Sequence, residues 1–283
     1  MLGANWLSRS AHSNPLGGPA GIQLYAVNSA MQENPAGTLK ELKTIGFGEV
    51  ETAGFGKLSA KEFRKLLDDS GLACPSAHLP FDIANLGPTF EDAHALGVHF
   101  VTSGSLRSSL RPPISGASSA MTLDEAKRTA DLANRIGGKA KQAGLQYAYH
   151  NHNAEFADQG GAVGYDVLLS ETSPELVKFE IDCGWMVLGG RNPIDYFRKF
   201  PNRFPMIHVK DFLPPRGKIA DAGKEPAYPG AELGHGIIDY KPIFAVAEKT
   251  GLQHYFAEQE GPFARMSQLQ AAQQAYAYLH SIS

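Results

Sequence analysis

Long apolar runs, basic runs and paired cysteines are all missing from this chain of 283 residues. No stretch reaches the ~18 uninterrupted apolar residues of a membrane span, so we expect no contact with a membrane. Lys and Arg total 26 against 29 Asp and Glu, which gives a formal net charge of -3, and the basic residues are not clustered. Nucleic-acid binding through many phosphate contacts is therefore not expected either.

Cysteine contributes only Cys74 and Cys183, far apart and without CxxC spacing. This scarcity excludes a disulfide framework and a zinc ribbon, and we expect both residues to be small buried apolar side chains. Hydrophobic side chains make up 43% of the sequence. A chain of this length and composition can bury a large core, which excludes disorder and a collagen-like fold.

The amino-terminal segment 1–20 is rich in Gly, Ser and Pro, and it lacks the apolar run of an intact signal peptide. We predict a flexible leader over 1–20 and one domain over 21–283. A trimmed export signal would also leave such a segment. Localisation therefore stays open, cytoplasmic by default and exported if the leader is the remainder of a signal.

One local pattern recurs along the chain: an amphipathic stretch ends in Gly, and one apolar residue and a β-rich run come next. Gly is favoured just beyond a helix because it adopts positive φ at little cost. The five joints of this kind lie at Gly46, Gly71, Gly97, Gly144 and Gly251. Three helix starts fit the capping box, with a hydroxyl followed by Glu three residues later, at Thr38, Ser59 and Thr122. The pattern predicts a repeated βα unit.

The repeat predicts eight strands and eight helices. The strands are expected at 21–27, 48–51, 73–78, 99–102, 145–150, 177–182, 205–209 and 254–259. The helices are expected at 38–45, 59–70, 90–96, 123–143, 165–173, 193–200, 240–250 and 267–280. Eight βα units match the α/β class and a single-domain (β/α)8 TIM barrel, for which about 250 residues are typical. An open doubly wound sheet is disfavoured, because no Gly-rich phosphate loop comes after the first strand.

Polar residues gather where the predicted strands end, which is where barrels of this type carry their active sites. Because side chains two apart share one face of a strand, four pairs are expected to point together: His150 with His152, Glu180 with Asp182, His208 with Lys210, and Glu258 with Glu260. A set of His150, Asp182, His208 and Glu258 would suit one divalent ion such as Mn, Co, Zn or Mg. Taken singly, such residues are more often structural.

Five runs together carry a specific resemblance: GIQLYAV (21–27), YHNHNAEF (149–156), EIDCGWMVLGGRNP (180–193), RFPMIHVKDF (203–212) and FAEQEG (256–261). They resemble the sugar phosphate isomerase/epimerase superfamily, the xylose isomerase-like TIM barrels. The resemblance implies one divalent metal held by Glu, Asp, His and Glu from strands 5 to 8. Asp182, His208 and Glu258 match the last three positions.

The strand 5 position departs from the epimerase pattern, because His150 stands where ketose epimerases place Glu. His150, His152 and Glu155 all stay open as the fourth ligand. The resemblance implies that epimerases exchange a proton between two carboxylates on opposite faces of the substrate. A histidine and a carboxylate of different pKa suit a lyase or dehydratase at least as well.

The site residues expected from these patterns fall into three roles. Catalysis is assigned to Glu258 as base, with His152 and Glu180 as further candidates. Metal binding is assigned to His150, Asp182, His208 and Glu258. Substrate contacts are assigned to Gln23, Glu51, His78, Trp185 and Lys210. The Gly- and Pro-rich segment 213–239 is a candidate lid or subunit contact.

We therefore expect a metal-dependent sugar isomerase or epimerase that removes an α-proton from a sugar or keto-sugar through a metal-stabilised enediolate. A lyase or dehydratase on the same site, resembling inosose dehydratases or 3-keto-glycoside lyases, is nearly as well supported. A non-catalytic sugar-binding barrel is a remote alternative, and an endonuclease is disfavoured by the charge. The expected partner is a small sugar or keto-sugar, without nucleic acid or membrane, and a homo-oligomer stays possible.

Overall fold

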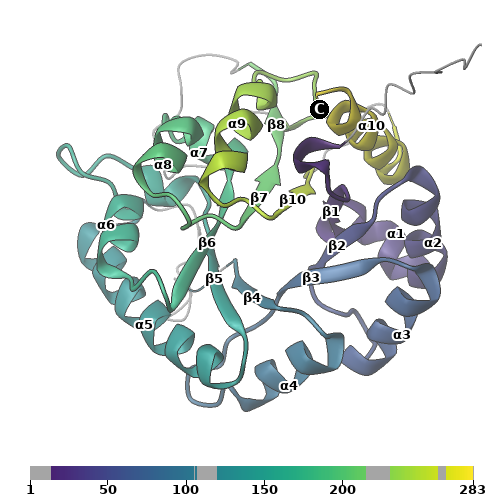
Figure 1. The fold of residues 1–283 in the computed structure, drawn as a ribbon, viewed down its shortest axis with the longest axis horizontal. Helices are drawn as coiled ribbons and strands as arrows, with labels where there is room; N and C mark the ends of the chain where they lie inside the picture. Colours follow the sequence, from purple (N-terminus) through teal and green to yellow (C-terminus); the bar gives the residue numbers. More distant parts are fainter. Residues whose placement is uncertain (1–13, 105, 107–119, 215–229, 261–265, 283) are drawn as a thin grey trace, which may run out of the picture.

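Eight parallel strands close into a barrel in the computed structural model, and helices surround it (Figure 1). The structure describes residues 14–104, 106, 120–214, 230–260 and 266–282. The barrel strands are β1 (Gly21–Gln23), β2 (Glu49–Thr52), β3 (Ala73–His78), β4 (Phe100–Ser103), β5 (Gln146–His150), β6 (Val177–Asp182), β7 (Met206–Val209) and β10 (His254–Ala257). The barrel closes because β1 pairs with both β2 and β10. The predicted (β/α)8 fold is thus confirmed.

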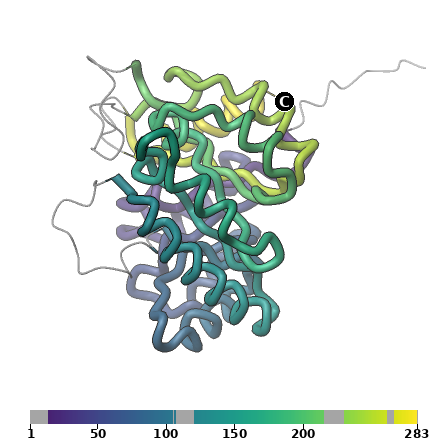
Figure 2. Tube along the Cα trace, turned by 90° about the vertical axis from the view of Figure 1, so that its left-hand side faces the viewer, coloured from purple at the N-terminus to yellow at the C-terminus, as the bar shows by residue number. Residues whose placement is uncertain are grey.

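Most helices lie between consecutive strands, outside the barrel. They are α1 (Asn28–Glu33), α2 (Pro35–Ile45), α3 (Ala60–Ser70), α4 (Gly87–Leu96), α5 (Leu123–Gln142), α6 (Gly164–Glu171), α7 (Cys183–Leu188), α8 (Pro193–Lys199), α9 (Tyr240–Ala247) and α10 (Gln268–Ser281). A small antiparallel pair, β8 (Asp211–Phe212) and β9 (Gly230–Ala231), comes after β7. Figure 2 shows the first elements, in purple, beside the last ones, in yellow, as the pairing of β1 with β10 requires.

Local signals located most of these elements. The bounds of β3 and β6 agree with the prediction, and Gly71 and Gly97 end their helices at φ 71° and 74°. The first strand is shorter than predicted. The side chain of Gln23 accepts a hydrogen bond from the Tyr25 amide, and the chain turns there into the 3-10 helix Leu24–Val27. Helices α1 and α7, each of six residues, were not predicted.

Two of the three predicted capping boxes are present. Ser59 and Thr122 each exchange hydrogen bonds with the glutamate three residues later. The third prediction, at Thr38, is wrong. Helix α2 begins one turn earlier, because Pro35 has the φ of a first helical residue and Asn34 caps the Gly37 amide.

Two apolar layers support the barrel, one on each side of its wall. Between the wall and the helices, Phe179 on β6 packs against Tyr165 on α6 and Phe204 before β7. Inside the barrel, four buried side chains form a separate cluster: Phe100, Ala148, Met206 and Phe256. Each lies two residues before a polar residue at the carboxyl end of its strand, so this cluster forms the floor of the polar site.

Replacement of Phe179 by alanine is expected to lower the free energy of unfolding by about 3–5 kcal/mol. Its side chain has no solvent exposure, and the aromatic rings around it cannot close the resulting cavity without moving β6. Chemical denaturation followed by circular dichroism measures this loss. The control is Tyr25→Ala, since Tyr25 is 49% exposed and should cost less than about 0.5 kcal/mol. A loss of similar size in both variants would contradict the assigned packing.

Only some of the remaining expectations about chain organisation can be compared with the structure. Residues 15–20 of the predicted leader are placed against the barrel: Pro15 is buried, and the Ala20 carbonyl accepts from the Gly48 and Glu49 amides. Segments 1–13 and 215–229 of the predicted leader and lid lie outside the described residues. Both cysteines are free and buried, as expected. In the described part of the chain, no helix combines the length and the apolarity needed to cross a membrane.

Candidate active site

The carboxyl ends of the barrel strands bring buried polar side chains together, as the sequence predicted. These side chains belong to residues at the ends of seven strands or just after them. Eight of these residues are Gln23, Glu51, His78, His150, Glu180, Asp182, His208 and Glu258. Six of them, all except Gln23 and Glu51, form two groups that share the imidazole of His208.

The first group consists of Asp182, His208 and Glu258, whose ligand atoms lie within 4.8 Å of one another. The Nδ1 atom of His208 is 2.9 Å from Oε2 of Glu258. One oxygen of Asp182, Oδ1, caps the Trp185 amide at 2.9 Å. The other, Oδ2, is buried and has no hydrogen-bond partner among the described residues. The Lys210 ammonium lies 3.3 Å from this oxygen, and a bound cation would satisfy it further.

Lys210 directly follows β7, and its side chain lies beside this first group. Its ammonium lies 2.9 Å from Glu258, 3.3 Å from Asp182 and 2.6 Å from Glu260. It also lies 4.9 Å from the centre of the Trp185 ring. The hydroxyl of Tyr240 fixes the Lys210 backbone on both sides, accepting from its amide and donating to its carbonyl. Lys210 is therefore a buried, firmly held positive charge beside two of the predicted metal ligands.

The charges of the first group shift each other's pKa values. Burial raises the pKa of Asp182 to about 6, although the Lys210 charge opposes this shift. Burial would also raise the pKa of Glu258, but Lys210 and His208 hold it well below its usual range. For His208, burial alone would lower the pKa, yet the carboxylates of Glu180 and Glu258 raise it well above the ordinary value. Glu258 is thus ionised at neutral pH.

The second group consists of His78, His150, Glu180 and the other ring nitrogen of His208. Oxygen Oε2 of Glu180 lies 2.7 Å from His78 Nε2, 3.1 Å from His150 Nδ1 and 3.2 Å from His208 Nε2. Burial would lower the pKa of His78, but Glu51 and Glu180 raise it to about 10. Burial and the His208 charge keep the pKa of His150 well below the ordinary value.

Glu51 lies beside the second group, and its carboxylate accepts hydrogen bonds from neighbouring side chains. Its Oε2 accepts from Gln23 at 2.8 Å and lies 2.7 Å from His208 Nε2, while Oε1 accepts from the Ser76 hydroxyl. Gln23 and Glu51 were predicted to bind substrate. Their side chains contact each other, and Glu51 orients the His208 ring; their contact with substrate stays a prediction.

The three candidates for the fourth metal ligand lie in different places. His150 joins the second group and pairs in register with Glu180. His152 rests against the His150 and Trp185 rings, at centroid distances of 5.0 and 6.1 Å, and burial lowers its pKa to about 4. Glu155 accepts from the Tyr149 hydroxyl at 2.7 Å and from the His152 amide at 3.1 Å. Glu155 thus fixes the loop after β5.

Several residues that shape the site carry no sequence signal of that role. The side chain of Asn151 donates to the Asp182 carbonyl and accepts from the Asp182 amide, at 3.2 and 3.0 Å. It therefore fixes the end of β6 against the end of β5. Ser76 and Tyr240 act in the same way on Glu51 and Lys210. Their partners are 25 to 31 residues away, so only the folded chain shows them.

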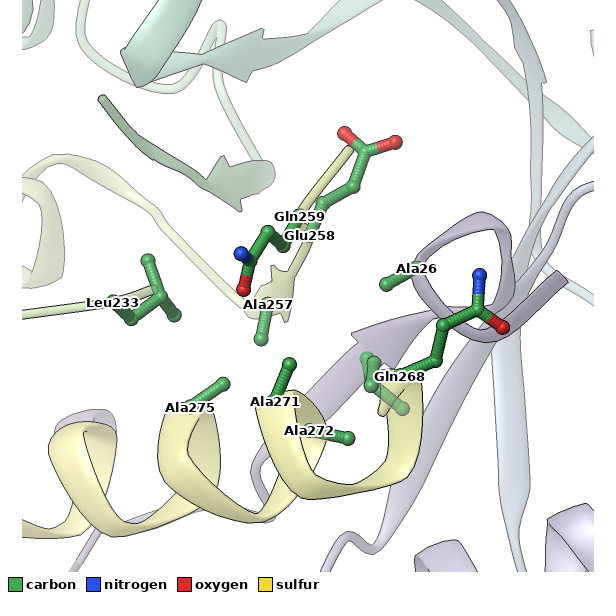
Figure 3. A pocket seen from close by; sticks show the side chains of 10 residues that line it. Ala26, Leu233, Ala257, Glu258, Gln259, Gln268, Ala271, Ala272 and Ala275 are labelled. Carbon is green, nitrogen blue, oxygen red and sulfur yellow. The ribbon is translucent and has the colours of Figure 1, made fainter. Parts of the chain in front are cut away.

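A cavity behind the site is lined by small apolar side chains, among them Ala257 of β10 and Ala271 and Ala275 of α10. Figure 3 shows these alanines on one side, while the Glu258 carboxylate points away from them. The cavity therefore lies apart from the charged groups of the site.

The fold and this site together define a (β/α)8 barrel with a candidate metal-binding site at the carboxyl ends of its strands. The chain belongs to the xylose isomerase-like TIM barrel family, whose model matches residues 39–281.

Individual relatives come from two kinds of sugar-processing enzyme. An inosose dehydratase of Clostridium tetani is 29% identical over 182 residues, which are 62% of this chain and 60% of that protein. The chain thus matches about three fifths of the length of this curated relative. A sugar phosphate isomerase/epimerase structure from Parabacteroides distasonis is 26% identical, with a TM-score of 0.73 over 92% of this chain and 97% of the other.

A third similar protein shows the fold alone. The structure of the IOLI protein is 13% identical, with a TM-score of 0.71 over 94% of this chain and 98% of the other, and was solved with a bound zinc atom.

Proposed function

We propose that this protein is a metal-dependent lyase that removes a proton beside the carbonyl of a keto-sugar or keto-cyclitol and eliminates water. The asymmetry of the site carries the proposal: Glu258 is an ionised carboxylate beside the ammonium of Lys210, and the strand 5 position holds His150. The match to inosose dehydratase supports the same outcome. We therefore reverse the order of the two activities expected from the sequence.

A divalent metal fits the first group. Asp182, His208 and Glu258 offer the mixed oxygen and nitrogen donors that Mn, Co or Zn accept. Asp182 Oδ2 is buried without a hydrogen-bond partner in the described residues, with the Lys210 ammonium 3.3 Å away. Such an ion, when bound, would polarise the substrate carbonyl and stabilise the negative charge that develops on its oxygen.

The protein's own side chains supply the proton chemistry. Glu258 takes the α-proton, because the charges of Lys210 and His208 keep it ionised. The Lys210 ammonium gives a proton to the departing oxygen, which leaves as water, and regains it from the protonated Glu258, 2.9 Å away. His152 is neutral at pH 7 because of its low pKa, and its ring can bind a substrate hydroxyl. Trp185 closes one side of the site, with its ring over Lys210.

Epimerisation is the second candidate, because it shares the first step and the Parabacteroides distasonis relative is described as an isomerase/epimerase. The two outcomes differ in the step after proton removal. An epimerase returns a proton to the same carbon, whereas a lyase expels the neighbouring oxygen.

Incubation of the metal-loaded protein with inosose or a 3-keto-glucoside in D₂O tests the proposal by NMR and mass spectrometry. The lyase reaction gives an unsaturated product, lighter by one water from inosose and by the aglycone alcohol from the 3-keto-glucoside. Epimerisation instead gives a product of unchanged composition with one deuterium on carbon, and this result would replace the lyase by the second candidate. Binding of these compounds without exchange or elimination would indicate a non-catalytic sugar-binding barrel.

A further inference from the structure

The second group of side chains converges on a single carboxylate oxygen. Three imidazole nitrogens, from His78, His150 and His208, lie 2.7 to 3.2 Å from one oxygen of Glu180, Oε2. The other oxygen, Oε1, is buried and has no hydrogen-bond partner among the described residues. Two carboxylate oxygens offer about four lone-pair sites in total. A purely hydrogen-bonded glutamate would share the donors between them.

Convergence of this kind is the geometry of ligands around one ion. Ligand atoms about 2.0–2.2 Å from a zinc ion lie roughly 3–3.5 Å from each other. The 3.1 Å separation of Glu180 Oε2 from His150 Nδ1 falls in this range, and the 2.7 Å separation from His78 Nε2 is shorter. The ligand atoms of the whole group lie within 4.8 Å of one another.

His208 separates this group from the first one. Its Nδ1 faces Glu258 and its Nε2 faces Glu51, at 2.9 and 2.7 Å. A metal-bound histidine usually donates its second ring N–H to a carboxylate, and Glu51 is placed to accept it. His208 can thus serve the first group through Nδ1 while His78, His150 and Glu180 bind an ion of their own.

We propose that His78, His150 and Glu180 form a second divalent-cation site, next to the Asp182, His208 and Glu258 group, with His208 and Glu51 outside its coordination sphere. Two histidines and one glutamate are a ligand set that binds zinc and leaves the fourth position open. The inference goes beyond the proposed function, since a lyase with one metal in the first group does not require it.

Zinc stoichiometry tests the proposal. The full chain is stripped with chelator, titrated with zinc by calorimetry and assayed by elemental analysis after desalting. The intact protein should bind two zinc ions, and His78→Asn should bind one, with at least a tenfold weaker affinity for the lost ion. Crystals of zinc-loaded protein should show two anomalous peaks, with the peak near Glu180 missing in the variant. Circular dichroism and thermal unfolding confirm that the variant is folded.

The control is His99→Asn, a matched change at an exposed histidine, which should still bind two ions. One ion in the intact protein, kept in His78→Asn and lost in Asp182→Asn, would overturn the second site and leave the proposed function standing. Two ions in both the intact protein and His78→Asn would also overturn it. An ion found only in the second site would instead remove the metal from the proposed lyase step.

Discussion

Glu258→Gln is expected to lower kcat/KM for elimination from a keto-sugar by about 10²–10⁴-fold, the usual contribution of a general base. The substitution preserves the size of the side chain but removes the charge that accepts the α-proton. Glu258 is also surrounded by positive charge, with Lys210 at 2.9 Å and His208 Nδ1 at 2.9 Å. The amide cannot balance these charges, so metal affinity should fall as well.

A metal titration separates the two effects of this variant. With saturating Mn, loss of the base still abolishes formation of the unsaturated product, whereas loss of the metal alone is restored by added ion. The control is Glu175→Gln, since Glu175 is exposed and pairs only with the exposed Lys141 in the described structure. Near-normal turnover in Glu258→Gln at saturating metal would assign the base to another residue.

Asp182→Asn is expected to weaken divalent-metal binding at the first group by about 100-fold or more. The substitution removes the charge of one of the three proposed ligands, Asp182, His208 and Glu258. The substitution keeps an oxygen that can cap the Trp185 amide, so α7 should still begin at Cys183. It replaces the buried Oδ2, which has no hydrogen-bond partner in the described residues. It also removes the charge that pairs with Lys210 at 3.3 Å, so the effect on the ion is compared with the stability of the metal-free variant.

Thermal unfolding with and without metal provides the measurement. An ion that binds only the folded state raises the melting temperature, so the metal-dependent rise should be smaller in Asp182→Asn, which keeps only the proposed second site, than in the intact protein at equal concentration. The control is Asp131→Asn on the exposed face of α5, which should retain the rise. An equal rise in Asp182→Asn and in the intact protein would place the metal elsewhere.

The sequence by itself determined the barrel and the identity of the residues in its mouth. Helix ends at Gly, capping boxes at Ser59 and Thr122, and the alternation within β6 are local features, so neighbouring residues suffice to show them. The same alternation placed Glu180 and Asp182 together on the inner face. Thr38 shows the limit of such signals, because Pro35 and Asn34 begin the helix before the apparent box is reached.

Only the tertiary structure decided which inward-facing residues meet. Alternation gives the face of a strand but not the height at which it stands beside its neighbour, which depends on the stagger of the closed barrel. In this barrel His150 is level with Glu180, and Asp182, two residues further along, is level with His208. That stagger assigns His150 to the group of His78 and Glu180 and leaves Asp182, His208 and Glu258 around Lys210, because contacts between distant segments exist only once all eight strands are closed.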